Sequence, residues 1–445
     1  MNQKSHDIKN LLISTINRQK QNLTGLVTNP QKDFSRNRKI PYEKIILSLL
    51  TMEGTSLTNE LLRQFGCELS TATAAAFVQQ RKKILPNALE SLFHDFASET
   101  CSDDLYKDYQ LLAVDGSDIQ IATNLNDTES LFQAEDGRKP YNLLHLNAMY
   151  NIKAHTYQDA VVYKPKVASE NKALREMVDR SNLSGKVIII ADRGYESYNN
   201  MAHIQEKGWK YLIRIKDFNK YSSGILHGLE LPNKDEFDEY IDLKLTRKQT
   251  NEMKELLKDK NHYRNISHSR AFDYLPSKCR KSDHTVMYAL PFRVVRFSIT
   301  DDSYEVVVTN LDRDEFSADV LKQLYGMRWG IETSFRDLKY TIGLLHFHSR
   351  KVEYILQEIF ARLIMYNFSE LITSHVVMEK KDRKYEYKAN FSVAVHICRE
   401  FLLGKNIPPN IEALIARYIT PIRPGRSRPR DMKVKQTISF MYRVA

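Results

Sequence analysis

The chain has 445 residues, of which 42% are hydrophobic, and a net charge of +11 from 66 Lys and Arg against 55 Asp and Glu. This length predicts two to four domains, and the composition excludes a disordered or fibrous protein. The natural partner of a basic globular protein of this size is nucleic acid, with a simply basic enzyme as the alternative.

The sequence also predicts the compartment. No apolar run is long enough to span a membrane, and the amino-terminal segment does not resemble a signal peptide. The four cysteines are far apart and match neither a zinc spacing nor a disulfide framework. We therefore expect free thiols in a reducing cytoplasm, and no contact with a membrane.

Residues up to about 100 are predicted to be helical. A polar stretch that ends near Lys39 precedes three helical patterns, at 41–52, at 59–65, and from the capping residues 70–73 to the residue before Pro86. Two short helices, a turn with Gly66 and a basic third helix favour a helix-turn-helix. An ordinary three-helix bundle is the alternative.

From residue 110 the pattern changes to strands. The apolar run 110–114 ends at Asp115, and Gly116 and Ser117 are predicted to form a turn. The following elements are strands at 143–152 and 157–163, a helix at 171–180, a strand at 186–191 that ends at Asp192, a helix at 199–207 and a strand at 210–216. This order predicts an α/β sheet with an antiparallel start and a parallel continuation.

A long stretch after residue 216 interrupts the sheet pattern. It contains a charged helical segment, 246–258, and β-like runs at 284–290 and 292–299, and it is too long for a loop. We expect an inserted subdomain, after which 304–310 resumes the sheet or closes the insert. Amphipathic helices follow near 353–371 and 391–403, and the basic segment 421–435 is either a phosphate-binding tail or a solvated one.

One helix, 319–342, is predicted between the insert and the carboxyl-terminal region. Apolar residues at three- and four-residue steps form its buried face. Tyr325, Arg328, Glu332 and Lys339 lie three, four and seven residues apart, so they share a narrow arc beside that face. The alternative is a solvated face with ion pairs at helical spacing, such as Glu332 with Arg336.

Three carboxylates are the candidates for chemistry. Asp115 and Asp192 both end buried strands, where side chains collect at the edge of an α/β sheet, and Glu332 comes from a helix that can pack beside it. Such carboxylates repel one another unless cations lie between them, and oxygen ligands suit Mg²⁺ or Mn²⁺. Taken alone, a strand-end aspartate is more simply a turn or cap residue, but this alternative is much weaker for all three carboxylates at once.

The neighbouring side chains suit phosphate. Two metal ions about 3.5–4 Å apart can activate a water or hydroxyl and stabilise the leaving oxygen of a phosphodiester. Arg328 and Lys339 supply positive charge, and Tyr325 supplies a hydrogen-bond donor. Asp118, three residues after Asp115, is a further carboxylate that can support the metal ligands.

The pattern Tyr325-x2-Arg328-x3-Glu332-x6-Lys339 resembles the YREK signature of one large group of bacterial insertion-sequence transposases. The surrounding LYGMRWGIETSFRDLK is similar to that family, as are AVDGSD around Asp115 and IIIADRGY around Asp192. The resemblance implies an RNase H-like catalytic core, a mixed sheet with flanking helices, interrupted by a β-rich insertion. The implied domains are an N-terminal helical DNA-binding domain (1–105), a core in two parts (106–216 and 306–370), the insertion (217–305), and a C-terminal helical region with the basic tail (371–445).

Carried over to this sequence, the resemblance implies that Asp115, Asp192 and Glu332 are the catalytic DDE triad and bind two Mg²⁺ ions, for which Mn²⁺ substitutes. The DNA-binding residues it implies are Tyr325, Arg328, Lys339, Arg193 and Arg214.

The implied activity is that of a transposase that binds the terminal inverted repeats of an insertion sequence. It would cleave the element ends by hydrolysis and transfer the 3′-hydroxyl ends into target DNA. The protein would act as a homodimer on DNA, in the bacterial cytoplasm at the nucleoid. The alternatives are a metal-dependent nuclease on the same core without strand transfer, and a non-catalytic end-binding regulator derived from a transposase.

Overall fold

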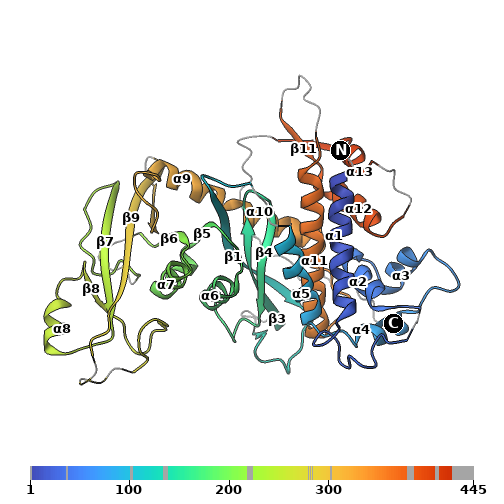
Figure 1. Ribbon diagram of the computed structural model, residues 1–445, viewed down its shortest axis with the longest axis horizontal. Coiled ribbons are helices and arrows are strands. Elements are labelled where there is room, and N and C mark those ends of the chain that lie inside the picture. Colours follow the sequence, from blue (N-terminus) through green and yellow to red (C-terminus); the bar gives the residue numbers. More distant parts are fainter. Residues whose placement is uncertain are drawn as a thin grey trace.

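The computed structural model describes residues 3–36, 39–100, 104–133, 139–217, 224–278, 280, 282, 284–300, 303–377, 385–405 and 410–422. Most of the predicted basic tail, from residue 423 on, lies outside these ranges. The molecule is elongated. The strands of the insert lie at one end of its long axis and the N-terminal helices at the other, with the core sheet between them (Figure 1).

The helices are α1 (Gln3–Gln21), α2 (Tyr42–Thr51), α3 (Leu57–Phe65), α4 (Ala74–Arg81), α5 (Asn87–Glu99), α6 (Glu170–Arg180), α7 (Tyr198–Glu206), α8 (Asn251–Leu256), α9 (Ala318–Met327), α10 (Trp329–Tyr340), α11 (Val352–Ser374), α12 (Phe391–Leu402) and α13 (Ile411–Ala416), with a 3₁₀ turn η1 (Arg193–Tyr195). The strands are β1 (Tyr109–Ile121), β2 (Leu131–Phe132), β3 (Tyr141–Asn151), β4 (Thr156–Tyr163), β5 (Lys186–Ala191), β6 (Lys210–Ile215), β7 (Phe237–Thr246), β8 (Tyr263–Asn265), β9 (Tyr288–Thr300), β10 (Ser303–Thr309), β11 (Tyr387–Ala389) and β12 (Ile419–Pro421).

The core sheet has the strand order β4-β3-β1-β5-β6. β1, β3 and β4 form an antiparallel meander, and β5 and β6 run parallel to β1. β5 has the apolar sequence KVIIIA and is buried except at its first residue, as a strand covered on both faces requires. This is the strand order of the RNase H-like fold, so the predicted fold class is confirmed.

The predicted turn at Gly116 and Ser117 is wrong. β1 runs through both residues, and its register with β3 continues from Leu112↔Asn151 to Ile121↔Asn142. Gly116 lies opposite Asn147, and the antiparallel ladder continues on both sides of it. Asp115 therefore lies within a long strand and not at its end.

The insert extends the core sheet. β10 pairs with β6 on one side and with β9 on the other, and β9 pairs in turn with β7. The end of the run predicted at 284–290 joins the run predicted at 292–299 in a single strand, β9, in which Pro291 lies opposite Asp242, and residues 284–287 lie outside it. The predicted charged helix is shorter, α8, and strand β7 was not predicted.

Alternate residues of β1 face two different hydrophobic cores. Leu111 and Ala113 pack in the core that contains α10 and α11, whereas Leu112 and Val114 pack in the core that contains α6 and α7. The first core also contains buried residues of α1, α2 and α5, which all contact α11. α1, within the polar stretch that ends near Lys39, is a regular helix whose Leu12 and Ile16 are buried.

Among the described residues, no helix is both long enough and apolar enough to cross a bilayer.

Candidate active site

The two aspartates start from equivalent positions on neighbouring strands. Val114 of β1 and Ala191 of β5 are partners in a parallel register, and Asp115 and Asp192 follow them. Asp115 continues the alternation of Leu111 and Ala113, which places it on the sheet face covered by α10. Oδ1 of Asp115 accepts a 2.9 Å hydrogen bond from the Gly116 amide, and Oδ1 of Asp192 accepts a 2.6 Å bond from the Arg193 amide, where Asp192 caps η1.

The single helix predicted at 319–342 is wrong, because α9 and α10 are separated at Arg328. The Arg328 amide donates to the Tyr325 carbonyl at 3.1 Å, and the Ile331 amide donates to the Arg328 carbonyl at 3.1 Å, both at the three-residue spacing of a tightened turn. Gly326 and Gly330 flank this turn and lower helix propensity there. The two helices still bring Arg328 to the sheet edge, where it is 3% exposed.

Arg328 is the centre of the site. Nη2 lies 2.8 Å from Glu332 Oε1, and Nη1 lies 3.7 Å from Asp115 Oδ2. The guanidinium also lies 5.5 Å from the centre of the Tyr325 ring. Its positive charge therefore compensates carboxylates from β1 and from α10 at once.

A second cation, Arg214 of β6, holds Asp192. Arg214 Nη2 lies 2.7 Å from Asp192 Oδ1, and Nη1 lies 2.8 Å from Oε1 of Glu305, the carboxylate on neighbouring β10. The Tyr325 hydroxyl donates a long 3.5 Å hydrogen bond to the same Asp192 oxygen. Sequence reasoning missed Glu305. The signal that could have found it is the alternation along YEVVVTN, which places Glu305 and Val307 on the face that also carries Val295 and the α9 residues.

The environments of the two aspartates differ. Burial raises the pKa of Asp115 to about 6, against opposing effects of the Gly116 amide and Arg328. Burial also acts to raise the pKa of Asp192, but the Arg193 amide and the Arg214 guanidinium outweigh it, and the pKa lies below its usual value. Asp192 is thus ionised at neutral pH, and a cation bound beside Asp115 would lower the raised pKa of that carboxyl.

The remaining predicted DNA contacts lie at different depths. Tyr325 and Arg328 are each 3% exposed, whereas Arg193 is exposed on η1. Lys339 of α10 donates a 2.9 Å hydrogen bond to the Asp118 carbonyl of β1, and Asp118 directs its carboxylate to His145 at 2.7 Å. Their contacts with DNA stay predictions.

The donor set fits a divalent metal in kind. Asp115, Asp192 and Glu332 offer only oxygen donors, which suit Mg²⁺ and Mn²⁺. In the described part of the chain no three His, Cys, Asp or Glu side chains lie close enough together to hold a metal ion. The Arg328 guanidinium lies between the Asp115 and Glu332 carboxylates, where it supplies the positive charge that these two groups need.

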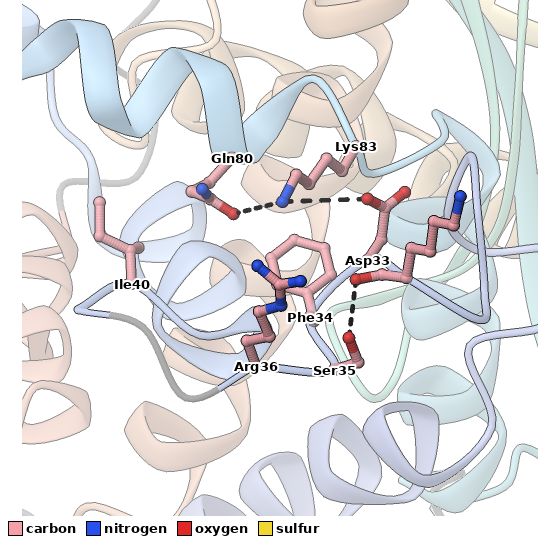
Figure 2. Close-up of a pocket in the computed structure, with 8 residues that line it drawn as sticks. Asp33, Phe34, Ser35, Arg36, Ile40, Gln80 and Lys83 are labelled. Carbon is pink, nitrogen blue, oxygen red and sulfur yellow. Dashed lines mark hydrogen bonds and ion pairs between the residues drawn. The ribbon is translucent and has the colours of Figure 1, made fainter.

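A separate basic cavity of about 320 Å³ lies in the N-terminal region. Figure 2 shows Lys83 between Gln80, at 3.0 Å, and Asp33, at 3.8 Å, with Phe34 and Arg36 beside them. The Lys83 ammonium lies 5.4 Å from the centre of the Phe34 ring. Arg81, the neighbouring basic residue of the predicted third helix, is buried instead and binds Glu358 of α11 at 2.9 Å.

The comparisons with known proteins bear on this geometry. The family model described as a transposase DDE domain matches residues 106–368, more than half of the chain. None of the curated proteins matches. Among solved structures, the chain is similar to a piggyBac transposase synaptic complex with hairpin DNA, solved by cryo-EM, at 11% identity over 94% of this chain and 87% of that chain, with a TM-score of 0.43. A similarity of that size adds no argument. The match over 106–368 contains Asp115, Asp192 and Glu332, and the chain belongs to the family of transposases with a DDE domain.

Proposed function

We propose that this DDE transposase belongs to the insertion-sequence group with the YREK signature and that it cleaves and joins DNA at the ends of its own element. The observation that carries the proposal is that Asp115, Glu332 and Arg328 meet, with Asp192 held alongside by Arg214 and Tyr325. These residues come from β1, the segment after β5, β6, and α9 and α10 with the turn between them, so the fold and not local sequence brings them together.

Transposases with this domain use divalent metal ions, generally Mg²⁺. Asp115, Asp192 and Glu332 are the proposed ligands of two such ions. Bound there, the ions would supply Lewis acidity for phosphodiester hydrolysis and for strand transfer. Burial raises the pKa of Asp115 whereas Arg328 acts to lower it, so a cation at this position stabilises the ionised carboxylate.

The protein's own residues have separate proposed roles. Arg214 and the Arg193 amide keep Asp192 ionised and fix its orientation. Arg328 neutralises Asp115 and Glu332 while the site lacks metal, and it is near enough to turn towards a phosphate when metal takes over that charge. Lys339 and exposed Arg193 are the proposed phosphate contacts at the rim of the site.

End recognition is proposed for the N-terminal helical region. The cavity in Figure 2 has three cationic side chains, Lys32, Arg36 and Lys83, against one carboxylate, Asp33. A surplus of positive charge in a concave surface suits a phosphate backbone. The assembly on DNA is proposed to be a homodimer, with one protomer for each element end.

The proposal is tested with purified protein, a labelled duplex carrying the terminal sequence of the element that encodes it, and a supercoiled target plasmid. Reactions with Mg²⁺, with Mn²⁺ and with EDTA are compared between the wild type and Asp192→Ala. The proposal expects metal-dependent cleavage at the element boundary and joining to the plasmid, both absent from Asp192→Ala. Nicking at many positions without joining would indicate a nuclease, and binding without cleavage under any metal would indicate a regulator. Either result contradicts the proposal.

A further inference from the structure

The glycines that follow the two aspartates lack space for a side chain. A Cβ on Gly116 would lie 2.4 Å from Nε2 of His145 and 2.9 Å from Oε1 of Glu170. A Cβ on Gly194 would lie 2.7 Å from Oε2 of Glu170. Neither glycine has a positive φ, so the backbone conformation does not require glycine at these positions. Both are therefore explained by the side chains packed against them.

One carboxylate lies against both glycines. Oε1 of Glu170 faces the chain one residue after Asp115, and Oε2 faces the chain two residues after Asp192. Glu170 is the first residue of α6, whose capping residue Ser169 accepts a hydrogen bond from the Lys172 amide. The next residue, Asn171, donates a 3.3 Å hydrogen bond to the Gly194 carbonyl. The start of α6 is thus anchored to the segment that carries Asp192.

His145 holds the Glu170 carboxylate from the other side. Nδ1 of His145 lies 2.7 Å from Asp118 Oδ1, its direct cross-strand neighbour between β1 and β3, and Nε2 lies 3.2 Å from Glu170 Oε1. Burial acts against the charged imidazolium, but the two carboxylates outweigh it and raise the pKa of His145 to about 9. His145 is therefore a cation at neutral pH, and it links Glu170 to β1 through Asp118.

The position of Glu170 matters because the sheet opens there. β1 and β5 are paired up to Val114 and Ala191. Beyond that pair β1 continues along β3, whereas the chain after Asp192 turns away into η1. No described strand pairing spans the gap between the two aspartate-bearing segments beyond that point. The Glu170 carboxylate spans it.

We propose that Glu170 is a positioning residue that sets the separation of the segments carrying Asp115 and Asp192. This inference rests on the proposed role of those aspartates as metal ligands. Glu170 lies on the α6 face of the sheet, whereas Asp115 is on the α10 face with Arg328 and Glu332. Glu170 therefore acts through the backbone at Gly116 and Gly194. A displacement of about 1 Å at such a site can lower the rate by up to about 100-fold.

The test uses a double-mutant cycle. Gly194→Ala keeps the Glu170 carboxylate but pushes it out of the gap, since the clashing atom is the end of a flexible side chain. Glu170→Ala removes the carboxylate, and the double variant does both. Glu170→Gln keeps its size, and Glu176→Ala on the same helix, which removes a carboxylate paired with Tyr163 and Arg180, is the matched control.

Two measurements are made on each full-length variant. The first is the rate of metal-dependent cleavage of the end duplex across a Mg²⁺ titration. The second is the rise in melting temperature on adding Mn²⁺ without DNA, which reports the metal site even in a protein that does not cleave. Melting temperature without metal and affinity for the duplex show whether each variant is folded.

Glu170→Ala and Gly194→Ala are each expected to lower the cleavage rate at least about tenfold and to raise the Mg²⁺ concentration that gives half the maximal rate. The double variant is expected to cleave no more slowly than Glu170→Ala. Glu170→Gln is expected within about threefold of wild type, and Glu176→Ala unchanged. Losses that multiply in the double variant, or single variants with wild-type rates and Mn²⁺ response, would overturn the inference. If Glu170→Ala does not fold, Gly194→Ala is compared with Glu170→Gln. The first displaces the side chain and should lose cleavage and the Mn²⁺ response, whereas the second keeps the side chain in place and should retain both. A wild type that never cleaves contradicts the proposed function alone, because the Mn²⁺ response still decides the role of Glu170.

Discussion

Replacing Glu332 by glutamine removes one proposed metal ligand with little change to packing. The Glu332 side chain is 27% exposed and pairs with Arg328, at 2.8 Å. The amide oxygen of glutamine can still accept this hydrogen bond, and repulsion with Asp115 is relieved, so we expect a loss of about 1 kcal/mol or less. In a chain of this size that lowers the melting temperature by no more than about 4 °C.

The effect on catalysis should be much larger. Loss of one ligand charge removes several kcal/mol of transition-state stabilisation, and about 3 kcal/mol already corresponds to a rate decrease of more than about 100-fold. The assay is single-turnover cleavage of the end duplex, with duplex affinity measured in parallel and Glu252→Gln on exposed α8 as a matched control. Cleavage at more than a tenth of the wild-type rate would refute the ligand role. Loss of both duplex binding and cleavage would contradict the expectation that Glu332 is not required for the protein to fold.

Three further changes test other parts of the account. Lys339→Ala should weaken duplex binding, because it removes one proposed phosphate contact, and the slope of log binding constant against log salt concentration should fall in magnitude by about 1. Lys339 lies outside the hydrophobic core, so a decrease in melting temperature of more than about 5 °C would contradict this placement. The raised pKa of Asp115 means that the native state binds a proton more tightly than the unfolded state. The free energy of unfolding without metal should therefore fall by about 1–3 kcal/mol as the pH rises from about 4 to 6. Urea unfolding should show this decrease in wild type but not in Asp115→Asn, and an equal decrease in both would show that another group is responsible. Arg81→Met should destabilise by about 3–5 kcal/mol, because Glu358 is 1% exposed and loses the guanidinium at 2.9 Å, which leaves it, among the described residues, only the contacts with His348. A variant with wild-type stability but weaker DNA binding would instead make Arg81 a DNA contact.

Much of the core could be predicted because hydrophobic periodicity identifies its strands. KVIIIA predicted β5 with its bounds, and the order of strands and helices up to residue 216 predicted a sheet with an antiparallel start and a parallel continuation. Asp115 and Asp192 were placed at one edge of the sheet because both follow apolar runs that are in fact paired in register. Arg328 and Glu332 follow from helical spacing, which survives the break between α9 and α10.

What could not be predicted depends on contacts between distant segments. Gly116 was interpreted as a turn residue because glycine favours turns, whereas here it makes room for His145 and Glu170. No local pattern connects Glu170, 55 residues after Asp115 in the sequence, to the aspartates. Arg81 belongs to the basic third helix predicted at 73–85, and only the contact of its side chain with α11 shows that it is buried against Glu358.

The central claim is that the three carboxylates bind divalent metal. The most direct measurement is the number of Mn²⁺ ions bound per protomer, by electron paramagnetic resonance, in the presence of the end duplex. The account predicts about two ions for wild type and a loss of at least one in Asp192→Asn and in Asp115→Asn, with duplex affinity retained. Equal Mn²⁺ binding by wild type and both variants would contradict it.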